Sequence, residues 1–262
     1  MITPSPVMYH TPPLLDPNSA PANNEPLDTS AVSRPKRGIA DTRYLWPQNH
    51  TLTIAFMDMP KKAQDLIKLT IESYAPLVNL KFKFVKGTVG DIRISGHKDI
   101  SGDWSAVGTA ALKAKKDKPT MHINLVNKAP SNVIKNTLHE FGHALGLEHE
   151  HQHPQRSYSF NKDGVYKSFL QPGITKEDID NNIIATPDPA NSITSAYDQK
   201  SIMHYGLSAS STSNNVEIPN NFELSEGDKA FLKQLYPPAV PKVKPQLTPE
   251  QIQARRYWSK RL

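Results

Sequence analysis

The 262-residue sequence contains no cysteine. Disulfide bonds, thiolate metal ligands and a cysteine nucleophile are therefore excluded, and folding does not depend on an oxidising compartment. The sequence also lacks any apolar run near the roughly 18 residues that a transmembrane helix needs. Residues 1–40 lack the basic and then apolar pattern of an ordinary secretory signal. These absences predict a chain without a transmembrane segment that needs no disulfides to fold.

Glycine and apolar residues are scarce, whereas proline is abundant: the chain has 12 glycines, 23 prolines and a hydrophobic fraction of 37%. This composition indicates that part of the length does not fold. We expect residues 1–40, rich in Pro, Ser and Asn, to form a disordered leader, and residues 239–262 to form a Pro-rich linker and a short basic tail helix. The basic cluster at 34–37 is read either as a processing site or as a solvated linker.

The formal net charge is +6, and nearly all of the excess lies between Lys242 and Leu262. The rest of the chain is close to neutral, which argues against a nucleic-acid-binding body. The basic tail could contact an anionic membrane surface weakly or carry a secretion signal, or it could be a solvated terminal helix. For the folded part we expect a monomer.

One stretch, from His139 to His149, has the pattern H-E-x-x-H-x-x-G-x-x-H. On a helix, residues four apart share a face, so His139 and His143 can bind one ion. Glu140 can reach a water on that ion without coordinating it. Gly146 is suited to end the helix and bring His149 back as a third ligand. Three nitrogens and one open position describe a catalytic site for one Zn²⁺ per chain.

The alternative reading of this stretch is an accidental histidine-rich helix end that binds metal loosely. His151 and His153 favour it slightly, but they lie beyond the expected turn and do not fit the spacing. We interpret both as loop residues or as neighbours of the ligands.

Hydrophobic periodicity outlines the elements around this stretch. Alternating or β-branched apolar residues predict strands at 51–57, 80–84, 92–94 and 120–125. Helical spacing predicts a helix between Pro60 and Pro76 and a second one over the zinc motif, capped by Ser131 or Asn132. These elements form an upper lobe, residues 41–149. A mostly irregular lower lobe, residues 150–238, follows, with expected helices at 161–169, 175–184 and 225–236.

The zinc motif together with Ser201-Ile202-Met203-His204-Tyr205 resembles the metzincin clan of metallopeptidases and, within it, the astacin family. The resemblance extends over residues 43–238, through Trp46-Pro47, 105–108 and 224–236. It implies an α+β, zincin-like, two-lobed catalytic domain. A mixed twisted sheet with two long helices would lie above the cleft, and the lower lobe would end in a C-terminal helix.

The resemblance also implies a role for each site residue. His139, His143 and His149 would bind zinc, and Glu140 would be the general base. Met203 would lie under the metal in a tight Met-turn. Tyr205 would be a fifth ligand whose hydroxyl moves to the oxyanion, and Glu150 corresponds to the glutamate that meets the mature amino terminus. The implied function is a zinc-dependent endopeptidase. The alternative is a non-catalytic zinc-dependent protein-binding module, against which the presence of Glu140 argues.

The substrates would be proteins or peptides bound in an extended form to an edge strand above the cleft. The strand that precedes the zinc-binding helix is our candidate for that edge. Its expected substrate-binding residues are Thr120, Met121, His122, Ile123 and Asn124.

The chain departs from the family in its leader. Family members typically have disulfides, a signal peptide and a propeptide with a Phe-x-Gly-Asp motif, none of which occurs here. Asp16 and Asp28 are candidate substitutes for the aspartate that blocks the zinc. These departures suit a bacterial protein exported by a specialised secretion machine, with delivery into a host cytosol as one destination and a cytoplasmic protein as the alternative.

Overall fold

The computed structural model describes residues 8–10, 38–171 and 174–238. The expectations for the basic cluster at 34–37, for Asp16 and Asp28, and for the linker and tail at 239–262 lie outside these residues.

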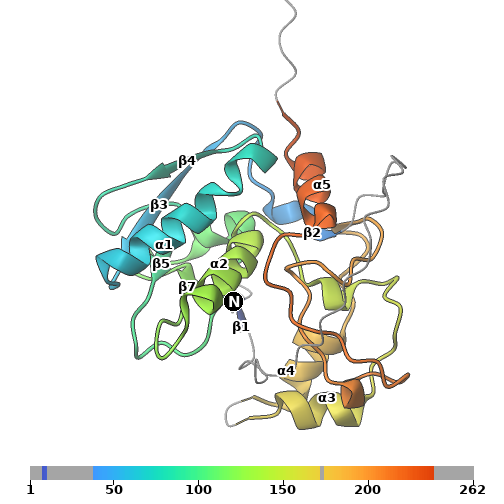
Figure 1. The fold of residues 1–262 in the computed structure, drawn as a ribbon. Coiled ribbons are helices and arrows are strands. Elements are labelled where there is room, and N and C mark those ends of the chain that lie inside the picture. Colours follow the sequence, from blue (N-terminus) through green and yellow to red (C-terminus); the bar gives the residue numbers. More distant parts are fainter. Residues whose placement is uncertain (1–7, 11–37, 172–173, 239–262) are drawn as a thin grey trace, which may run out of the picture.

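A six-stranded sheet forms the framework of the upper lobe, with the order β1-β6-β7-β5-β3-β4 (Figure 1). The parallel strands are β3 (Thr51–Met57), β4 (Lys81–Phe84), β5 (Ile92–Ser95) and β7 (Met121–His122). Antiparallel pairing adds β6 (Trp104–Ala106) to β7, and β1 (Met8–His10) to β6. The predicted mixed sheet is confirmed.

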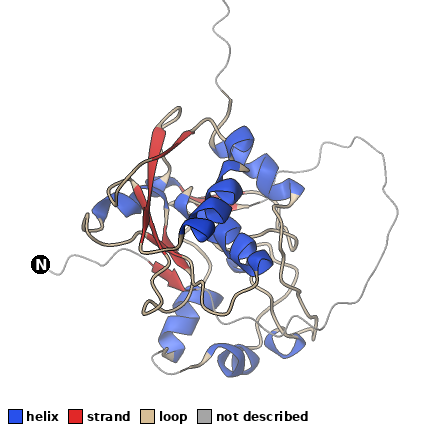
Figure 2. Ribbon diagram, turned by 60° about the vertical axis from the view of Figure 1, so that its left-hand side comes forward, coloured by secondary structure: helices blue, strands red, loops and turns tan. Residues whose placement is uncertain are grey.

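Two long helices, α1 (Lys61–Glu72) and α2 (Pro130–Ala144), pack against each other on one side of this sheet (Figures 1 and 2). Tyr74, which follows α1, is buried and donates a hydrogen bond of 2.6 Å to the carbonyl oxygen of Leu138. Phe141 contacts the rings of Tyr74 and Phe82, each at a centroid distance of 5.3 Å. This aromatic cluster holds α2 in a fixed position above the sheet.

The lower lobe has little regular structure, as predicted. Its helices are α3 (Lys162–Phe169), α4 (Lys176–Ile179), a π-helical turn (Asp180–Ile184) and α5 (Glu226–Leu235). A two-stranded sheet joins β2 (Ile39–Asp41) to β8 (Ser192–Thr194). Short 3-10 helices occur in both lobes, at Thr42–Tyr44, Ala75–Leu77, Gly108–Lys113, Glu150–Gln152 and Ala209–Ser211.

Two helix predictions need correction. Helix α2 has Ala129 as its N-cap and Pro130 in its first turn, with no side-chain cap, so the expected capping by Ser131 or Asn132 is wrong. Proline is favoured there because its fixed φ suits a helix and its missing N–H would have no partner. The single helix expected at 175–184 is instead α4 followed by the π-helical turn.

The substrate-edge prediction is also wrong. The strand expected at 120–125 contains only Met121 and His122, and it pairs on both sides, with β5 and with β6. Thr120, Met121, His122 and Ile123 are buried, and Asn124 is half-buried. An interior strand has no free backbone groups for a substrate. Beyond β7 the sheet continues through β6, a strand that the sequence analysis missed.

The folded part begins earlier than expected. Ile39 is 1% exposed and pairs with Thr194, so residues 38–40 belong to the domain and not to the leader. Residues 8–10, also assigned to the disordered leader, form β1 on the edge of the large sheet. The leader prediction is therefore wrong at these two places.

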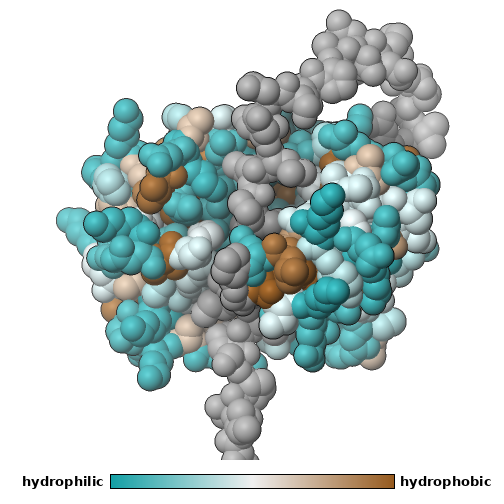
Figure 3. Space-filling model, turned by 90° about the horizontal axis from the view of Figure 1, so that it is seen from below, coloured by the Kyte–Doolittle hydropathy of each residue, from teal (hydrophilic) through white to brown (hydrophobic). Residues whose placement is uncertain are grey.

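The described surface is mostly hydrophilic on the face seen from below, with apolar residues in small patches (Figure 3). The large exposed apolar side chains come from separate segments of the chain, such as Leu69, Leu170 and Phe222. In residues 38–171 and 174–238, no helix combines the length and apolar character that crossing a membrane requires.

Candidate metal centre

The C-terminal half of α2 presents two histidines from one helical face. His139 and His143 lie four residues apart, and their ring centroids are 4.9 Å from each other. Both side chains are buried. The two imidazoles therefore lie close together on the helix, at the spacing that the motif predicts.

Gly146 lies two residues after the last residue of α2 and turns the chain there, as predicted. Gly146 has φ of 93°, a left-handed value that glycine adopts without strain. Its N–H donates to the His143 carbonyl at 2.8 Å, and the N–H of Leu147 donates to the Gly142 carbonyl at 3.0 Å. These two bonds form a Schellman motif, which reverses the chain and directs His149 toward the first two histidines.

Two aromatic side chains hold this helix end from outside. The indole N–H of Trp46 donates to the Ala144 carbonyl at 2.8 Å, and the hydroxyl of Tyr236 donates to the Leu145 carbonyl at 2.7 Å. Both aromatic residues are buried. They satisfy carbonyls that the helix leaves without internal partners. The end of α2 is therefore fixed at the point where the chain turns toward His149.

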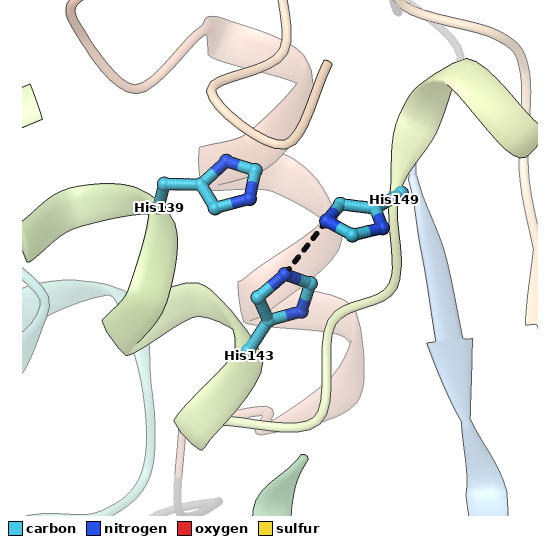
Figure 4. A group of neighbouring side chains, drawn as sticks. All are labelled: His139, His143 and His149. Atoms are coloured by element: carbon cyan, nitrogen blue, oxygen red, sulfur yellow. Dashed lines mark hydrogen bonds between the residues drawn. The ribbon is translucent and has the colours of Figure 1, made fainter. Parts of the chain in front are cut away.

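The three imidazoles converge on one point (Figure 4). Ligand atoms of His139, His143 and His149 all lie within 4.8 Å of one another, and the Nε2 atoms of His143 and His149 are 3.0 Å apart. Nδ1 of His139 lies 2.8 Å from the Ile202 carbonyl oxygen, and Nδ1 of His143 lies 2.8 Å from that of Leu147. Because a carbonyl can only accept, each Nδ1 carries the proton, and each Nε2 keeps its lone pair for a metal.

These residues fit a zinc ion. Burial lowers the pKa of His139 and His149 well below the ordinary value and that of His143 to about 4, so all three are neutral near pH 7. Neutral imidazole is the form that binds metal. The buried Nε2 of His139 has no hydrogen-bond partner among the described residues, as expected of an atom that a metal would satisfy. Three imidazole ligands would leave the fourth tetrahedral position of a zinc ion open.

Two residues predicted to act with the metal, Glu140 and Met203, lie on α2 and against it. Glu140 is buried on α2 between the two helical ligands. A turn closed by the His204 N–H and the Ser201 carbonyl, 3.0 Å apart, buries Met203 beneath α2. A Cβ on Gly142 would lie 2.5 Å from Met203 Sδ, so only glycine allows this approach.

Tyr205 follows this turn and faces the ligands. Its ring centroid lies 4.3 Å from that of His149 and 5.5 Å from that of His139. The structure therefore brings Tyr205 against the three histidines, while Met203 packs against Gly142 and Glu140 is buried on the same helix.

His151 and His153 were read from the sequence as loop residues or neighbours of the ligands, whereas His204 was given no role of its own. His151 is buried and stacks on Tyr205 with centroids 4.4 Å apart. His204 is buried too, with Nε2 2.8 Å from the Tyr197 hydroxyl. His153 contacts the Ser195 carbonyl oxygen through Nε2 at 2.8 Å and does not join the three-histidine cluster. Sequence spacing carries no signal for these contacts, since they depend on how the lower lobe folds back.

Two further predicted residues have structural contacts. His122 uses both ring nitrogens on backbone carbonyls, those of Gly102 at 2.6 Å and His97 at 3.1 Å. These contacts hold the loop between His97 and Gly102 against β7. Glu150 is buried, and one of its carboxylate oxygens accepts the Asp198 N–H at 2.6 Å.

Comparison with known proteins identifies the family. The model of the astacin peptidase family matches residues 38–230. The chain belongs to the astacin family. Its resemblance to that family, first seen in the zinc motif and the segment around Met203, is thereby confirmed. The α+β fold with a mixed twisted sheet is that of the astacin-type metzincin proteases.

The similar proteins include zinc proteases. The chain is 34% identical over 112 residues to the zinc metalloproteinase nas-39 of Caenorhabditis elegans; the match covers 38% of this chain and 11% of that protein. A structure of myroilysin superimposes with a TM-score of 0.73 at 31% identity, covering 78% of this chain and all of the other. The hatching enzyme HCE-1 of the medaka Oryzias latipes has a TM-score of 0.52 at 19% identity, over 74% of this chain and 95% of its own, which shows the shared fold.

Family membership and the three-histidine cluster agree on the cofactor. The domain is that of a zinc metallopeptidase, and His139, His143 and His149 are the described residues that could hold the ion.

Proposed function

We propose that this chain hydrolyses internal peptide bonds of proteins, with His139, His143 and His149 as the zinc ligands and Glu140 as the general base. The observation that carries the proposal is the convergence of three buried, neutral imidazoles beside a carboxylate on the same helix. One open metal position next to a proton acceptor is what hydrolysis requires.

Zinc held by these ligands would supply a Lewis acid and lower the pKa of a bound water to about 7. Glu140 would accept a proton from the attacking water and deliver it to the leaving amine. Because Glu140 is buried, bulk water competes little with it for that proton.

Tyr205 would donate a hydrogen bond from its hydroxyl to the oxyanion that forms on the substrate carbonyl. The contact of its ring with His149 supports this role. We assign the tight turn around Met203 as the Met-turn, in which the thioether packs under α2 and leaves Gly142 no room for a side chain.

An extended substrate would pair with β6 and not with the strand after Thr120. The far side of β6 is the edge of the sheet once β1 is set aside, and α2 packs against β6. Main-chain pairing binds many sequences, which suits a peptidase of broad specificity.

We further propose that β1 occupies this substrate edge in the full-length chain. Residues 8–10 pair antiparallel with β6 in the register Met8 with Ala106 and His10 with Trp104. In Figure 1, β1 lies at the lower edge of the sheet, toward the helices of the lower lobe. The leader would then compete with substrate for the same backbone groups.

Cleavage of casein by wild type and Glu140→Gln tests the function. We expect Glu140→Gln to lose at least about 100-fold in rate while still binding zinc, because only proton transfer is removed. A chelator should abolish wild-type cleavage, and added zinc should restore it. Zinc binding without cleavage, both in the full-length chain and after removal of residues 1–37, would instead support a non-catalytic zinc-dependent binding module.

A further inference from the structure

Asp228, in the first turn of α5, is a carboxylate that the zinc motif does not include. It is 2% exposed. Ser201 donates to it through its hydroxyl at 2.6 Å, Ile202 through its N–H at 2.8 Å, and Ser225 through its N–H at 2.9 Å. No Lys or Arg pairs with Asp228 within the described part of the chain. Its charge is therefore balanced by hydrogen bonds alone.

Two of these bonds hold the turn beneath the metal centre. The Ser201 hydroxyl that donates to Asp228 also accepts the Met203 N–H at 3.0 Å. The carbonyl of Ile202, whose N–H is held by Asp228, accepts the Nδ1 proton of His139 at 2.8 Å. Asp228 is thus linked to the imidazole of His139 through a single residue, Ile202.

The same turn also contacts the other end of the zinc motif. The carbonyl oxygen of Met203 accepts the N–H of Glu150, the residue after His149, at 3.1 Å. A shift of the turn would consequently move supports of both His139 and His149.

Helix capping alone does not account for a buried carboxylate at this position. Asp228 forms a capping box with Ser225, but an equivalent box on α4, Thr175 with Asp178, is exposed to solvent. Burying a carboxylate is costly unless hydrogen bonds compensate it. At Asp228 the extra bonds, absent from the α4 box, are those to Ser201 and Ile202.

We propose that Asp228 is a positioning residue for the zinc centre, holding the Ser201–Met203 turn so that Ile202 orients the imidazole of His139. This inference rests on the proposed assignment of His139 as a ligand. Partners that orient a metal-binding histidine typically change metal affinity by about 10- to 100-fold when removed.

The test is zinc affinity, measured by competition with a chromophoric chelator, on full-length apo proteins whose circular dichroism shows them folded. Asp228→Ala and Ser201→Ala should each bind zinc about 10- to 100-fold more weakly than wild type. Asp228→Asn keeps an acceptor for the two N–H groups and should recover much of the affinity. Asp178→Ala, the matched change in the exposed box of α4, should stay within about twofold of wild type.

Ser201→Ala keeps the capping box of α5. Its zinc affinity therefore tests the inference even if Asp228→Ala does not fold. Zinc affinities of Ser201→Ala and of any folded Asp228→Ala within about twofold of wild type would overturn the inference, whatever their thermal stability. Failure of the proposed function is a separate outcome, in which wild type binds zinc tightly but cleaves no protein.

Discussion

His151 illustrates, at the scale of the residue, how a side chain outside the zinc motif shapes the site. Its imidazole is buried and stacks on the Tyr205 ring with an interplanar angle of 22°. It also lies 4.8 Å from the ring of His149. The ring of Tyr205 is thereby held between groups that limit its orientation.

We predict that His151→Ala lowers kcat about tenfold or more and changes KM little, because a loosened Tyr205 misplaces its hydroxyl in the transition state. His151→Phe keeps a stacking ring and should retain most of the activity. Steady-state kinetics on a quenched fluorescent peptide measures both. Equal losses in the two variants would show that stacking is not the role of His151.

The charge of Asp228 makes a prediction about pH. Burial raises its pKa from the ordinary 3.8 to about 6, and the neighbouring Asp198 adds to the effect. A raised carboxyl pKa means that the fold favours the protonated form. Stability from this group is therefore present below about pH 4 and is lost as the pH rises through about 6.

The free energy of unfolding of wild type, minus that of Asp228→Asn, should fall by about 2 kcal/mol between about pH 4 and pH 7. Urea denaturation of the two apo proteins across this range measures the difference, in which other titrating groups largely cancel. A difference that does not change with pH would contradict a raised pKa.

At the scale of the element, the end of α2 decides whether the third ligand reaches the first two. Gly146 has φ of 93°, and a Cβ there would lie 2.8 Å from Leu45 Cδ2. Any side chain would strain the Schellman motif and push against the segment that carries Trp46. The direction of the chain toward His149 depends on this one position.

Gly146→Ala should destabilise the fold by about 1–3 kcal/mol and weaken zinc binding. The matched control is Gly87→Ala, which has a similar φ of 83° but open space around it. It should cost about 1 kcal/mol of stability and leave zinc affinity unchanged. Urea denaturation and chelator competition on both variants separate backbone strain from the loss of ligand geometry.

The strands show where periodicity stops being informative. Alternation along residues 120–125 correctly predicted that Met121 and Ile123 are buried, but His122 is buried as well and Leu125 is only half-buried. Alternation also does not say which strands lie on either side. Burial of Met121 between β5 and β6 follows from the antiparallel return of β6, a strand of three residues. So short a strand leaves almost no pattern to detect.

At the scale of the whole molecule, the leader and the sheet are linked through β1. If β1 competes with substrate for β6, removing residues 1–37 should lower the apparent KM for a peptide substrate about tenfold and change kcat little. The residues from Gly38 onward remain in that truncated chain and keep the pairing of β2 with β8. Initial rates of both forms over a range of substrate concentrations measure the effect.

A proline at position 9 provides the control within the full-length chain. Tyr9 pairs with Ser105, and proline in a strand removes an N–H and restricts the backbone. Tyr9→Pro should therefore reproduce part of the change seen on truncation. A truncated chain with unchanged KM would contradict competition between β1 and substrate.

The sequence by itself determined the zinc motif, the helix that carries it and the glycine that ends it. These features depend on local spacing and backbone conformation, which neighbours in the chain set directly. It also indicated the partner segment around Met203 and Tyr205, but only through resemblance to a family.

Only the tertiary structure showed that β6 continues the sheet past β7, that residues 8–10 pair with β6, and that Asp228 and His139 both contact Ile202. These contacts join segments far apart in the sequence. They form when the lower lobe folds back under α2 and the strands pair. Local sequence patterns do not predict this pairing, because it depends on the packing of the whole chain.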